Sequence, residues 1–454
     1  MLFTEINYFL FLTACAIAYS CLPSKFRSCF LLATSYVFYA TFDWRFTFLL
    51  LGQTLLCFFC AKYRKNTLAI ILSILELAVF KYFNFFNDSF RQLFENLHLP
   101  YLIPHLDIIL PVGISFFTFQ SLGYVIDVSQ GKIQQENNFV RFALFTAFFP
   151  QITAGPIGRA NELLPQFQEA RRPAVQQISE GIQLIIWGLF QKMVVADRLA
   201  SYITRAYASP QTASGGTLLV ASIFFSIQIY ADFSGYSDIA RGSAKFFGIN
   251  LRNNFNFPYF ATSIPDFWKR WHISLTSWFR DYLYIPMGGN RVSKPKWIRN
   301  QLVVFLLSGL WHGANWTFIL WGAIHGDFNL VHIMLLGKNK ESQSWIINLM
   351  RCIVTFAIVN VAWIFFRAPT FKRAIQIIIR IMTHPTRPTF GVSQITFALN
   401  VFAIMILFGV DFAAYRGFTG ERCPDAVRIP GYAVIACLIA LLAVSSSSFI
   451  YLQF

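Results

Sequence analysis

The sequence predicts an all-α protein that crosses a membrane many times, with about eleven membrane segments and further helices lying in the membrane interface. Of its 454 residues, 56% are hydrophobic and 13% are charged, whereas about a quarter of the residues in soluble domains are charged. Several apolar runs are long enough to cross the ~30 Å hydrocarbon layer of a bilayer. Basic residues, which give the chain a net charge of +16, gather in the short loops between these runs. Basic loops of this kind are typical of the cytoplasmic side of a membrane protein.

The composition also narrows the kinds of partner and cofactor. Because the basic residues lie in loops between apolar runs, the charge indicates membrane lipids and an anionic cytoplasmic ligand rather than nucleic acid. Most of the eight cysteines lie inside apolar runs, where cysteine behaves as a small hydrophobic residue. Cys57 and Cys60 form a CxxC pair without a second pair, so we expect no metal and no bound cofactor. We expect one domain over residues 1–454.

The first four spans alternate with basic loops. Lys25 follows the first span, and Lys62, Arg64 and Lys65 follow the third. The positive-inside rule then places these loops in the cytoplasm and the N-terminus outside, with 84–107 as an external loop. The expected spans are 6–22, 29–42, 46–61 and 67–83.

The rest of the chain adds further apolar segments, one of them interrupted. The segment at 140–151 runs into Gly155 and Pro156, and such a break at membrane depth is tolerated only inside protein or beside water. The segment at 371–382 mixes basic and apolar residues and is expected to be a helix in the membrane interface. The remaining spans are expected at 108–125, 218–230, 346–366, 397–412 and 433–449. The apolar run at 178–195 also carries charged and amide side chains, so two interpretations of it are open: a span, or a segment in the membrane interface.

Residues 263–291 are predicted to form one amphipathic helix in the membrane interface. Ser263 and Asp266 match a capping box. An aromatic apolar face opposes a polar face, and His272 falls at the edge between them. Pro286 and the glycines after it would end the helix. The apolar face comprises Trp268, Trp271, Leu275, Trp278, Phe279 and Tyr282, and the polar face comprises Arg270, Ser274, Ser277, Arg280 and Asp281.

The apolar stretch that follows, 301–337, must bend. It contains no Lys, Arg or Glu, and as one straight helix it would measure ~55 Å, which exceeds the ~30 Å of hydrocarbon. If the span starts near Arg299, His312 lies ~16–18 Å along it, near the bilayer midplane. An ionisable residue at that depth is a functional candidate. Two interpretations of His312 are open: a general base, or a residue that bonds a backbone carbonyl and fixes helix packing.

Three other polar residues also have competing interpretations. His272 could act in the reaction or could be a histidine at the polar edge of an interfacial helix. On a continuous helix, His325 would lie ~20 Å beyond His312. That separation would exclude a dyad or a shared metal and would give His325 a structural role or a place at the exit. Asp232 is expected to pair with Arg241 rather than to act as an acid.

Several motifs together resemble a known family. FWKRWHISLTSWFRDYLYIPMGGNR starts at Phe267, and LSGLWHGANWTFILWGAIHG starts at Leu307. They are accompanied by PVGISFFTFQSLGYVIDV, FPQITAGPIGR, YADFSGYSDIARG and WIFFRA. These motifs resemble the membrane-bound O-acyltransferases, and more narrowly their bacterial alginate-acetylase branch. They occur in order over about 111–368, and the D-alanyl transferase branch shares RWH but not the YIPMGGNR extension.

The resemblance implies helices around a central tunnel and an enzyme that passes an acyl group, foremost acetyl, from a cytoplasmic thioester to an extracytoplasmic polysaccharide hydroxyl. The donor substrate implied is acetyl-CoA or another acyl thioester. The implied partner is a periplasmic or membrane-anchored protein that resembles serine hydrolases and relays the group. The resemblance also implies that His312 and His272 are catalytic, with His312 of the WHG motif as the general base, and that the chain lies in the bacterial cytoplasmic membrane.

Residues around the two histidines are candidates for substrate binding. Arg280 and Asp281 could belong to a basic mouth for the phosphates of coenzyme A, or to a solvated face with local ion pairs. Trp311 and Asn315 could line the path of the substrate. The candidate residues are Trp271, Arg280, Asp281, Tyr284, Asn290, Trp311, Asn315 and His325.

Two alternative functions stay open. A D-alanyl transferase of the same family would use similar motifs for another acyl group. A transporter or flippase would also place polar residues at the midplane beside broken helices, although neither half of the sequence duplicates the other. Release of CoA from a thioester would distinguish the enzyme from the transporter. Alginate, cellulose, peptidoglycan and other exopolysaccharides all fit the motifs as acceptors.

Overall fold

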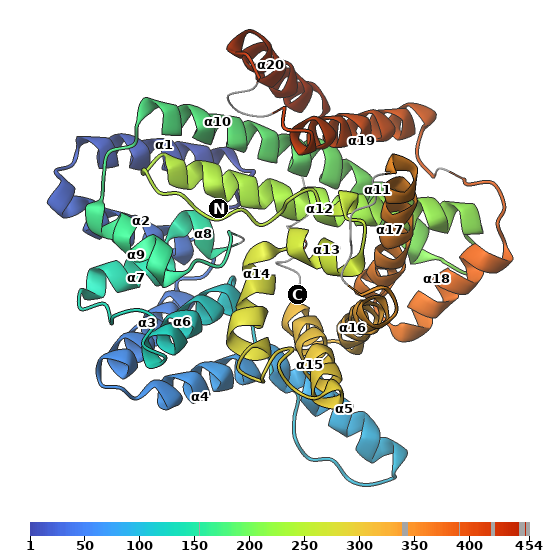
Figure 1. The fold of residues 1–454 in the computed structure, drawn as a ribbon, viewed down its shortest axis with the longest axis horizontal. Helices are drawn as coiled ribbons and strands as arrows, with labels where there is room; N and C mark the ends of the chain where they lie inside the picture. The colour runs from blue at the N-terminus through green and yellow to red at the C-terminus, as the bar shows by residue number, and fades with distance from the viewer. Residues whose placement is uncertain (154, 338–343, 390, 419–422, 445–449, 451–454) are drawn as a thin grey trace. The chain divides into compact units, whose positions relative to one another are not determined.

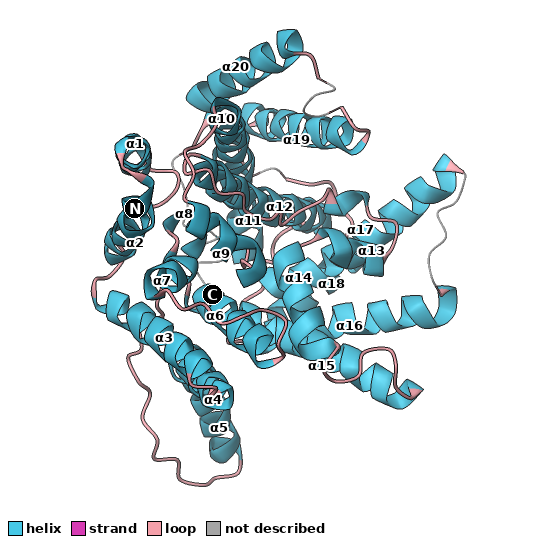
Figure 2. Cartoon of the chain, turned by 60° about the vertical axis from the view of Figure 1, so that its left-hand side comes forward, coloured by secondary structure: helices cyan, strands magenta, loops and turns pink. Residues whose placement is uncertain are grey.

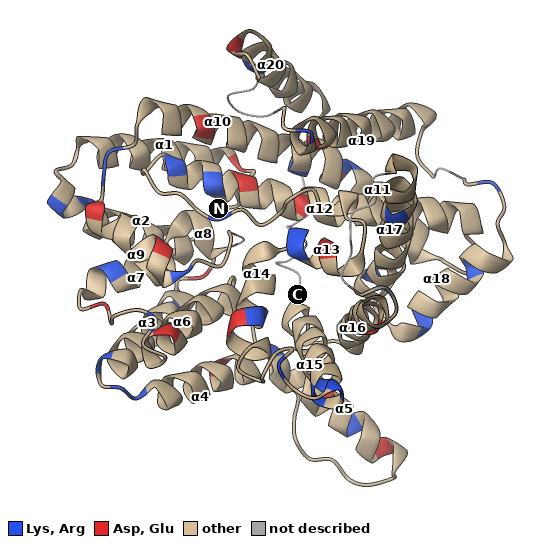
Figure 3. Cartoon of the chain, viewed as in Figure 1, with Lys and Arg blue, Asp and Glu red and all other residues tan. Residues whose placement is uncertain are grey.

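The computed structural model describes residues 1–454 except 154, 338–343, 390, 419–422, 445–449 and 451–454. Throughout these described residues the chain forms helices and connecting loops, without a strand (Figure 2). Most of the helix length carries no charged residue (Figure 3). The predicted all-α class is therefore confirmed.

Eight helices in the described part of the chain are long and apolar enough to cross a membrane. Two shorter apolar helices, Ile6–Cys21 and Phe139–Ile152, accompany them. The eleven expected segments therefore include helices too short to meet this length criterion. The eight are Arg45–Lys62, Asn66–Asn96, Val175–Ala208, Gly215–Lys245, Trp316–Leu335, Trp345–Arg367, Gln394–Tyr415 and Asp425–Leu442.

Contacts between residues divide the chain into two compact units. The first comprises Met1–Gly181, Ala240–Arg252 and Gly313–Asn315. The second comprises Ile182–Ile239, Asn253–His312 and Trp316–Phe454. The single domain expected over 1–454 stays a prediction.

The first unit holds the helices that Figure 1 draws from blue to green. They are α1 (Ile6–Cys21), α2 (Ser24–Ala40), α3 (Arg45–Lys62), α4 (Asn66–Leu77), α5 (Phe83–Asn96), α6 (Ile114–Ser129), α7 (Phe139–Ala147), α8 (Phe149–Ile152) and α9 (Ala160–Glu169). In this unit α2 packs against α7, and α6 packs against α3 and α4. The buried Arg27 donates to the carbonyl oxygens of Leu22 and Ala170, at 3.0 and 2.8 Å, and so ties α2 to the chain after α9.

Two boundary predictions in this unit are wrong. The expected external loop at 84–107 is helical over its first half, because α4 continues through a π-helical segment, Ala78–Tyr82, into α5. No Gly or Pro occurs between residues 66 and 96 to stop that helix. The span expected at 108–125 begins only at α6, after Gly113, whose φ is +74°. A Cβ atom on Gly113 would lie 2.4 Å from the carbonyl oxygen of Ile152, so this turn requires glycine.

The second unit holds the remaining helices. They are the end of α10 (Val175–Leu189), α11 (Asp197–Ala208), most of α12 (Gly215–Lys245), α13 (Ile264–Arg270), α14 (Ile273–Phe279), α15 (Lys294–His312), α16 (Trp316–Leu336), α17 (Trp345–Arg367), α18 (Phe371–Thr383), α19 (Gln394–Tyr415) and α20 (Asp425–Leu442). The expected helix at 371–382 is confirmed as α18, while its place in the interface stays a prediction. Part of the span expected at 433–449 lies outside the described residues.

A charged triad is buried inside the second unit. Lys192 lies in a π-helical segment, Phe190–Ala196, that joins α10 to α11. Its Nζ atom is 2.7 Å from a carboxylate oxygen of Asp197 and 2.7 Å from one of Asp232 on α12. All three side chains are at most 2% exposed. Asp232 therefore pairs with Lys192, which corrects the expected pairing with Arg241.

We predict that Lys192→Met destabilises the protein strongly, because it leaves two carboxylates buried without their shared ammonium. Breaking a buried ion pair on one side costs about 3–5 kcal/mol. Thermal unfolding in detergent should show a large loss, with much of it recovered when Asp197→Asn and Asp232→Asn are added.

The control is Lys245→Met. Lys245 pairs with Glu180 at 2.6 Å, but these side chains are 16% and 43% exposed, and exposed pairs contribute about 0–1 kcal/mol. Equal losses for Lys192→Met and Lys245→Met would contradict the prediction.

The predicted bend in 301–337 is confirmed as a helix hairpin. α15 ends at His312, α16 begins at Trp316, and the two helices pack along each other. Glycines allow the close approach: a Cβ atom on Gly309 would lie 2.2 Å from the carbonyl oxygen of Phe318, and one on Gly322 would lie 2.3 Å from that of Phe305. Small residues at helix contacts are typical of membrane helices.

We predict that Gly309→Ala and Gly322→Ala each destabilise the protein, since the added methyl group meets backbone that cannot move aside. Overpacking of this kind costs about 1–3 kcal/mol. Gly409→Ala on α19 is the control, because nothing lies within 4 Å of its Cβ position and alanine favours helix over glycine by about 1 kcal/mol. Thermal unfolding checks the prediction, and losses no larger than for Gly409→Ala would contradict it.

Candidate active site

The predicted amphipathic helix at 263–291 is in fact two short helices that meet at His272. Its start is confirmed, because the Ser263 side chain accepts a hydrogen bond from the Asp266 backbone N–H. α13 then ends at Arg270, Trp271 is extended, and His272 has left-handed backbone angles, with φ 41° and ψ 54°. α14 begins directly after it. The single interfacial helix is therefore a wrong prediction.

Hydrogen bonds from one loop stabilise this break. The Asn256 backbone N–H donates to the Arg270 carbonyl oxygen, and the Ile273 N–H donates to that of Asn254, both at 2.9 Å. The Asn254 side chain also accepts from the Ser274 hydroxyl at 2.7 Å. Backbone groups that lose helical partners at the break thus gain partners from the loop, as buried backbone requires. His272 turns inward and is 0% exposed, not at the edge of a polar face.

The break brings His272 close to His312 inside the second unit. His312 is the last residue of α15 and is 2% exposed. The centroids of the two imidazole rings are 6.3 Å apart. At that separation the rings cannot hydrogen-bond to each other directly. Burial lowers the pKa of His272 to about 3, so its imidazole is neutral at neutral pH.

Aromatic rings form a wall around His312. Its ring centroid lies 5.1 Å from that of Trp311, 4.9 Å from Trp321 and 5.5 Å from Phe366, with interplanar angles of 71° to 85°. On the other side of the pair, Phe233 lies 4.6 Å from the His272 ring. Rings that meet near perpendicular hold one another in place, so the imidazole planes have little freedom to turn.

His325 is also part of this cluster, which corrects the expectation of a ~20 Å separation from His312. Because α16 folds back along α15, the Trp321 ring lies 4.9 Å from His312 and 4.9 Å from His325. His325 is 0% exposed and also contacts Trp268 at 4.9 Å and Phe267 at 6.1 Å. The continuous helix assumed for the prediction does not exist.

The other candidate residues are spread over the segments beside the two histidines. Trp271 is fully buried against Trp363, at 5.0 Å, and Trp311 lies in the wall just described. Arg280 and Asp281 pair with each other at 2.8 Å, with 63% and 27% of their side chains exposed. Tyr284 accepts a hydrogen bond from Gln301 at 3.2 Å. Asn290 is exposed, and Asn315 is half-buried in the connection after α15.

Sequence reasoning missed Trp321, Phe366 and Phe233. All three lie inside motifs that carried the family resemblance, so that resemblance was the signal that could have found them. Nothing in the spacing of Phe233 on α12 indicates a contact with His272. In the part of the chain that the structure describes, no group of three or more His, Cys, Asp or Glu side chains is arranged to hold a metal ion.

Comparisons with known proteins show the family to which the chain belongs. A family model described as the membrane-bound O-acyltransferase family matches residues 130–337. The chain is 39% identical over 386 residues to the probable alginate O-acetylase of Pseudomonas aeruginosa. The aligned region covers 82% of this chain and 72% of that protein.

Two other relatives carry different acceptor names. The peptidoglycan O-acetyltransferase of Helicobacter pylori is 36% identical over 394 residues, covering 78% of this chain and 73% of that protein. The teichoic acid D-alanyltransferase of Bacillus subtilis is 29% identical over 319 residues, covering 67% of this chain and 78% of that protein. With its apolar helices and its buried histidines, the chain belongs to the membrane-bound O-acyltransferase family and is a multi-pass membrane enzyme similar to the alginate O-acetylases.

Proposed function

We propose that this enzyme passes an acetyl group from a cytoplasmic thioester across the membrane to an extracytoplasmic polysaccharide hydroxyl, with His312 as the general base. The observation that carries the proposal is the pairing of His312 with His272, two buried imidazoles 6.3 Å apart. Similarity to an alginate O-acetylase and a peptidoglycan O-acetyltransferase supports acetyl as the group and a polysaccharide as the acceptor.

The reaction requires one proton to be accepted and returned. His312 accepts the proton of the acceptor hydroxyl while the hydroxyl oxygen attacks the carbonyl carbon of the thioester. The carbon–sulfur bond then breaks, and the leaving thiolate takes the proton from the imidazolium. The products are an ester and a free thiol, and His312 is neutral again. A positioned general base contributes about 10²–10⁴-fold to such a step.

The aromatic wall supports this role in two ways. Trp311, Trp321 and Phe366 hold the His312 ring in one orientation, which favours proton transfer along one direction. Aromatic faces also attract cations, and by more where water is excluded. The imidazolium that forms during the reaction is thereby stabilised. His272 orients the thioester on the other side of the reacting carbonyl.

The donor is acetyl-CoA, or another acyl thioester, that enters from the cytoplasm beside the exposed basic segment that leads into the first turn of α15. Arg291, Lys294 and Lys296 are all exposed in this segment. Phosphates of coenzyme A are attracted to such a cluster. The acetyl group then reaches the polysaccharide through a periplasmic or membrane-anchored partner that resembles serine hydrolases, in a bacterial cytoplasmic membrane with the N-terminus outside.

D-alanyl transfer is the second candidate function, and the 29% identity to a teichoic acid D-alanyltransferase is the observation that favours it. The identity of 36–39% to proteins named as O-acetylases or O-acetyltransferases favours acetyl. Supplying the purified enzyme with acetyl and D-alanyl thioesters in parallel distinguishes the two, because only the matching donor is turned over.

We predict that His312→Gln lowers acetyl transfer by about 10²–10⁴-fold, because glutamine can keep a hydrogen bond but cannot take up the proton. The protein should insert normally and still bind the donor. Transfer of radiolabelled acetyl to the acceptor, measured beside donor binding, checks this.

The control for His312→Gln is His332→Gln, on the same helix hairpin but outside the histidine pair. It should retain near wild-type transfer. A monodisperse His312→Gln protein with wild-type transfer would show that His312 only contributes to packing.

We also predict that reversing Arg291, Lys294 and Lys296 to Glu weakens acetyl-CoA binding, and that the difference from wild type shrinks as salt is raised. Reversal of Lys62, Arg64 and Lys65, another exposed basic cluster, is the control and should leave donor affinity unchanged. Titration of acetyl-CoA by calorimetry measures both. Equal affinities for the two triple variants would contradict the assigned entry point.

A further inference from the structure

The first unit carries a long helix that the enzymatic reaction does not explain. α4, the π-helical segment and α5 form one helix of 31 residues, Asn66–Asn96 (Figure 1). Such a helix measures about 46 Å, against about 30 Å of hydrocarbon. One end of it must therefore leave the hydrocarbon or run along its boundary. Beyond residue 96 the chain continues as an extended segment through residues 99–110.

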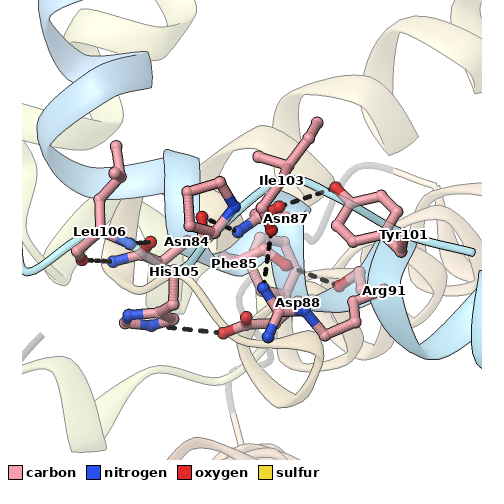
Figure 4. A network of polar contacts seen from close by, with 11 residues as sticks. Asn84, Phe85, Asn87, Asp88, Arg91, Tyr101, Ile103, His105 and Leu106 are labelled. Carbon is pink, nitrogen blue, oxygen red and sulfur yellow. Dashed lines mark hydrogen bonds and ion pairs between the residues drawn. The ribbon is translucent and has the colours of Figure 1, made fainter.

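The polar stripe of α5 binds this extended segment (Figure 4). Asn84 donates to the carbonyl oxygen of Leu106 at 2.7 Å and accepts from its N–H at 3.1 Å. Asn87 donates to the Pro104 carbonyl oxygen at 2.9 Å. Three hydrogen bonds from side chains of α5 thus satisfy backbone groups of a segment that has no regular secondary structure of its own.

Two further contacts complete this attachment. Arg91 donates to the Ile103 carbonyl oxygen at 2.8 Å, and its guanidinium lies 5.8 Å from the Tyr101 ring. The Tyr101 hydroxyl donates to the Asn87 side chain at 2.7 Å. We call residues 83–109 the arm: a helix whose polar side faces its own return segment.

The apolar side chains of the arm face outward. Phe86, Phe90, Leu93 and Leu97 recur at three- and four-residue spacing, so they form one stripe on α5, and they are 43%, 53%, 49% and 57% exposed. On the return segment, Leu102 is 90% exposed, and the exposed residues there also include Ile103, Leu106 and Ile109.

This arrangement is the reverse of that in a water-soluble helix hairpin, which buries its apolar stripe and exposes its polar one. It is the arrangement expected where the surroundings are apolar, because non-helical backbone there must find its hydrogen-bond partners within the protein. One charged contact limits the depth. His105 and Asp88 lie 3.6 Å apart with 51% and 53% of their side chains exposed, so this side of the arm needs water or lipid headgroups.

We propose that the arm lies in the boundary between headgroups and acyl chains, with lipid covering Phe90, Leu102 and their apolar neighbours. The arm continues a helix that is long enough to span the membrane, and the apolar stripe on α5 extends the apolar surface of α4. We therefore infer that lipid, rather than a protein partner, covers the exposed side chains of the arm. In this proposal, the external loop expected at 84–107 is instead an arm at the membrane boundary. The proposal does not depend on the role assigned to His312.

Spin labels on the arm test this in the full-length enzyme. The native cysteines that are not buried, Cys21, Cys29, Cys352, Cys423 and Cys437, are first replaced by serine. A label is then placed at Phe90→Cys or Leu102→Cys, and at Glu95→Cys as the matched control. Glu95 is exposed and follows Arg91 by four residues on the polar stripe of the same helix.

The protein is reconstituted in vesicles of phosphatidylethanolamine and phosphatidylglycerol, and each label is exposed to oxygen and to a water-soluble nickel chelate. Oxygen concentrates in acyl chains, whereas the chelate stays in water. We expect the ratio of oxygen to chelate collisions to be at least about 5-fold higher at residues 90 and 102 than at residue 95. Phe86→Cys and Ile109→Cys replace any labelled variant that is not monodisperse.

Two results would overturn the proposal. Ratios at residues 90 and 102 equal to that at residue 95 would place the arm in water. Labels at residues 90 and 102 that neither reagent reaches would show that a protein surface covers the arm, and since only this chain is present, the covering surface would be a second copy.

Discussion

The hydrogen bonds that Asn254 and Asn256 make on the two sides of His272 are the interactions on which the site depends. An unbroken helix from Ser263 onward would satisfy its backbone hydrogen bonds internally and would leave His272 on the helix surface. Asn254 and Asn256 instead provide partners for the backbone at a break, so the chain can turn there without burying unsatisfied groups. The left-handed backbone of His272 is the result, and it directs the imidazole into the core of the second unit.

The same constraint, that polar groups in apolar surroundings need partners within the protein, recurs elsewhere in the chain. It joins Lys192 to two carboxylates from different segments in the second unit. In the first unit, it attaches an extended segment to α5 through Asn84 and Asn87. A soluble protein could leave such groups to water. In a membrane protein, each of these contacts fixes the path of a segment that has few other specific interactions.

The histidine site combines two properties that oppose each other in water. Burial keeps an imidazole neutral, which makes it able to accept a proton, yet burial also makes the charged product costly. In the proposed reaction, the rings of Trp311, Trp321 and Phe366 around His312 would reduce that cost, because aromatic rings attract a cation without themselves carrying a charge that needs solvation. An aromatic wall is therefore compatible with both of the charge states that the proposed reaction requires of His312.

The sequence by itself determined the all-helical membrane class, the helix start capped by Ser263 and the presence of a bend within 301–337. These follow from hydropathy, side-chain capping and span length, which depend on residues close together in the chain. Only the tertiary structure decided the break at His272, the Lys192 triad and the approach of His325 to Trp321. Each of these depends on partners from separate segments, and no local pattern records which segments will meet. The physical reason is that such contacts gain their free energy only when the chain has already folded and excluded water from both partners.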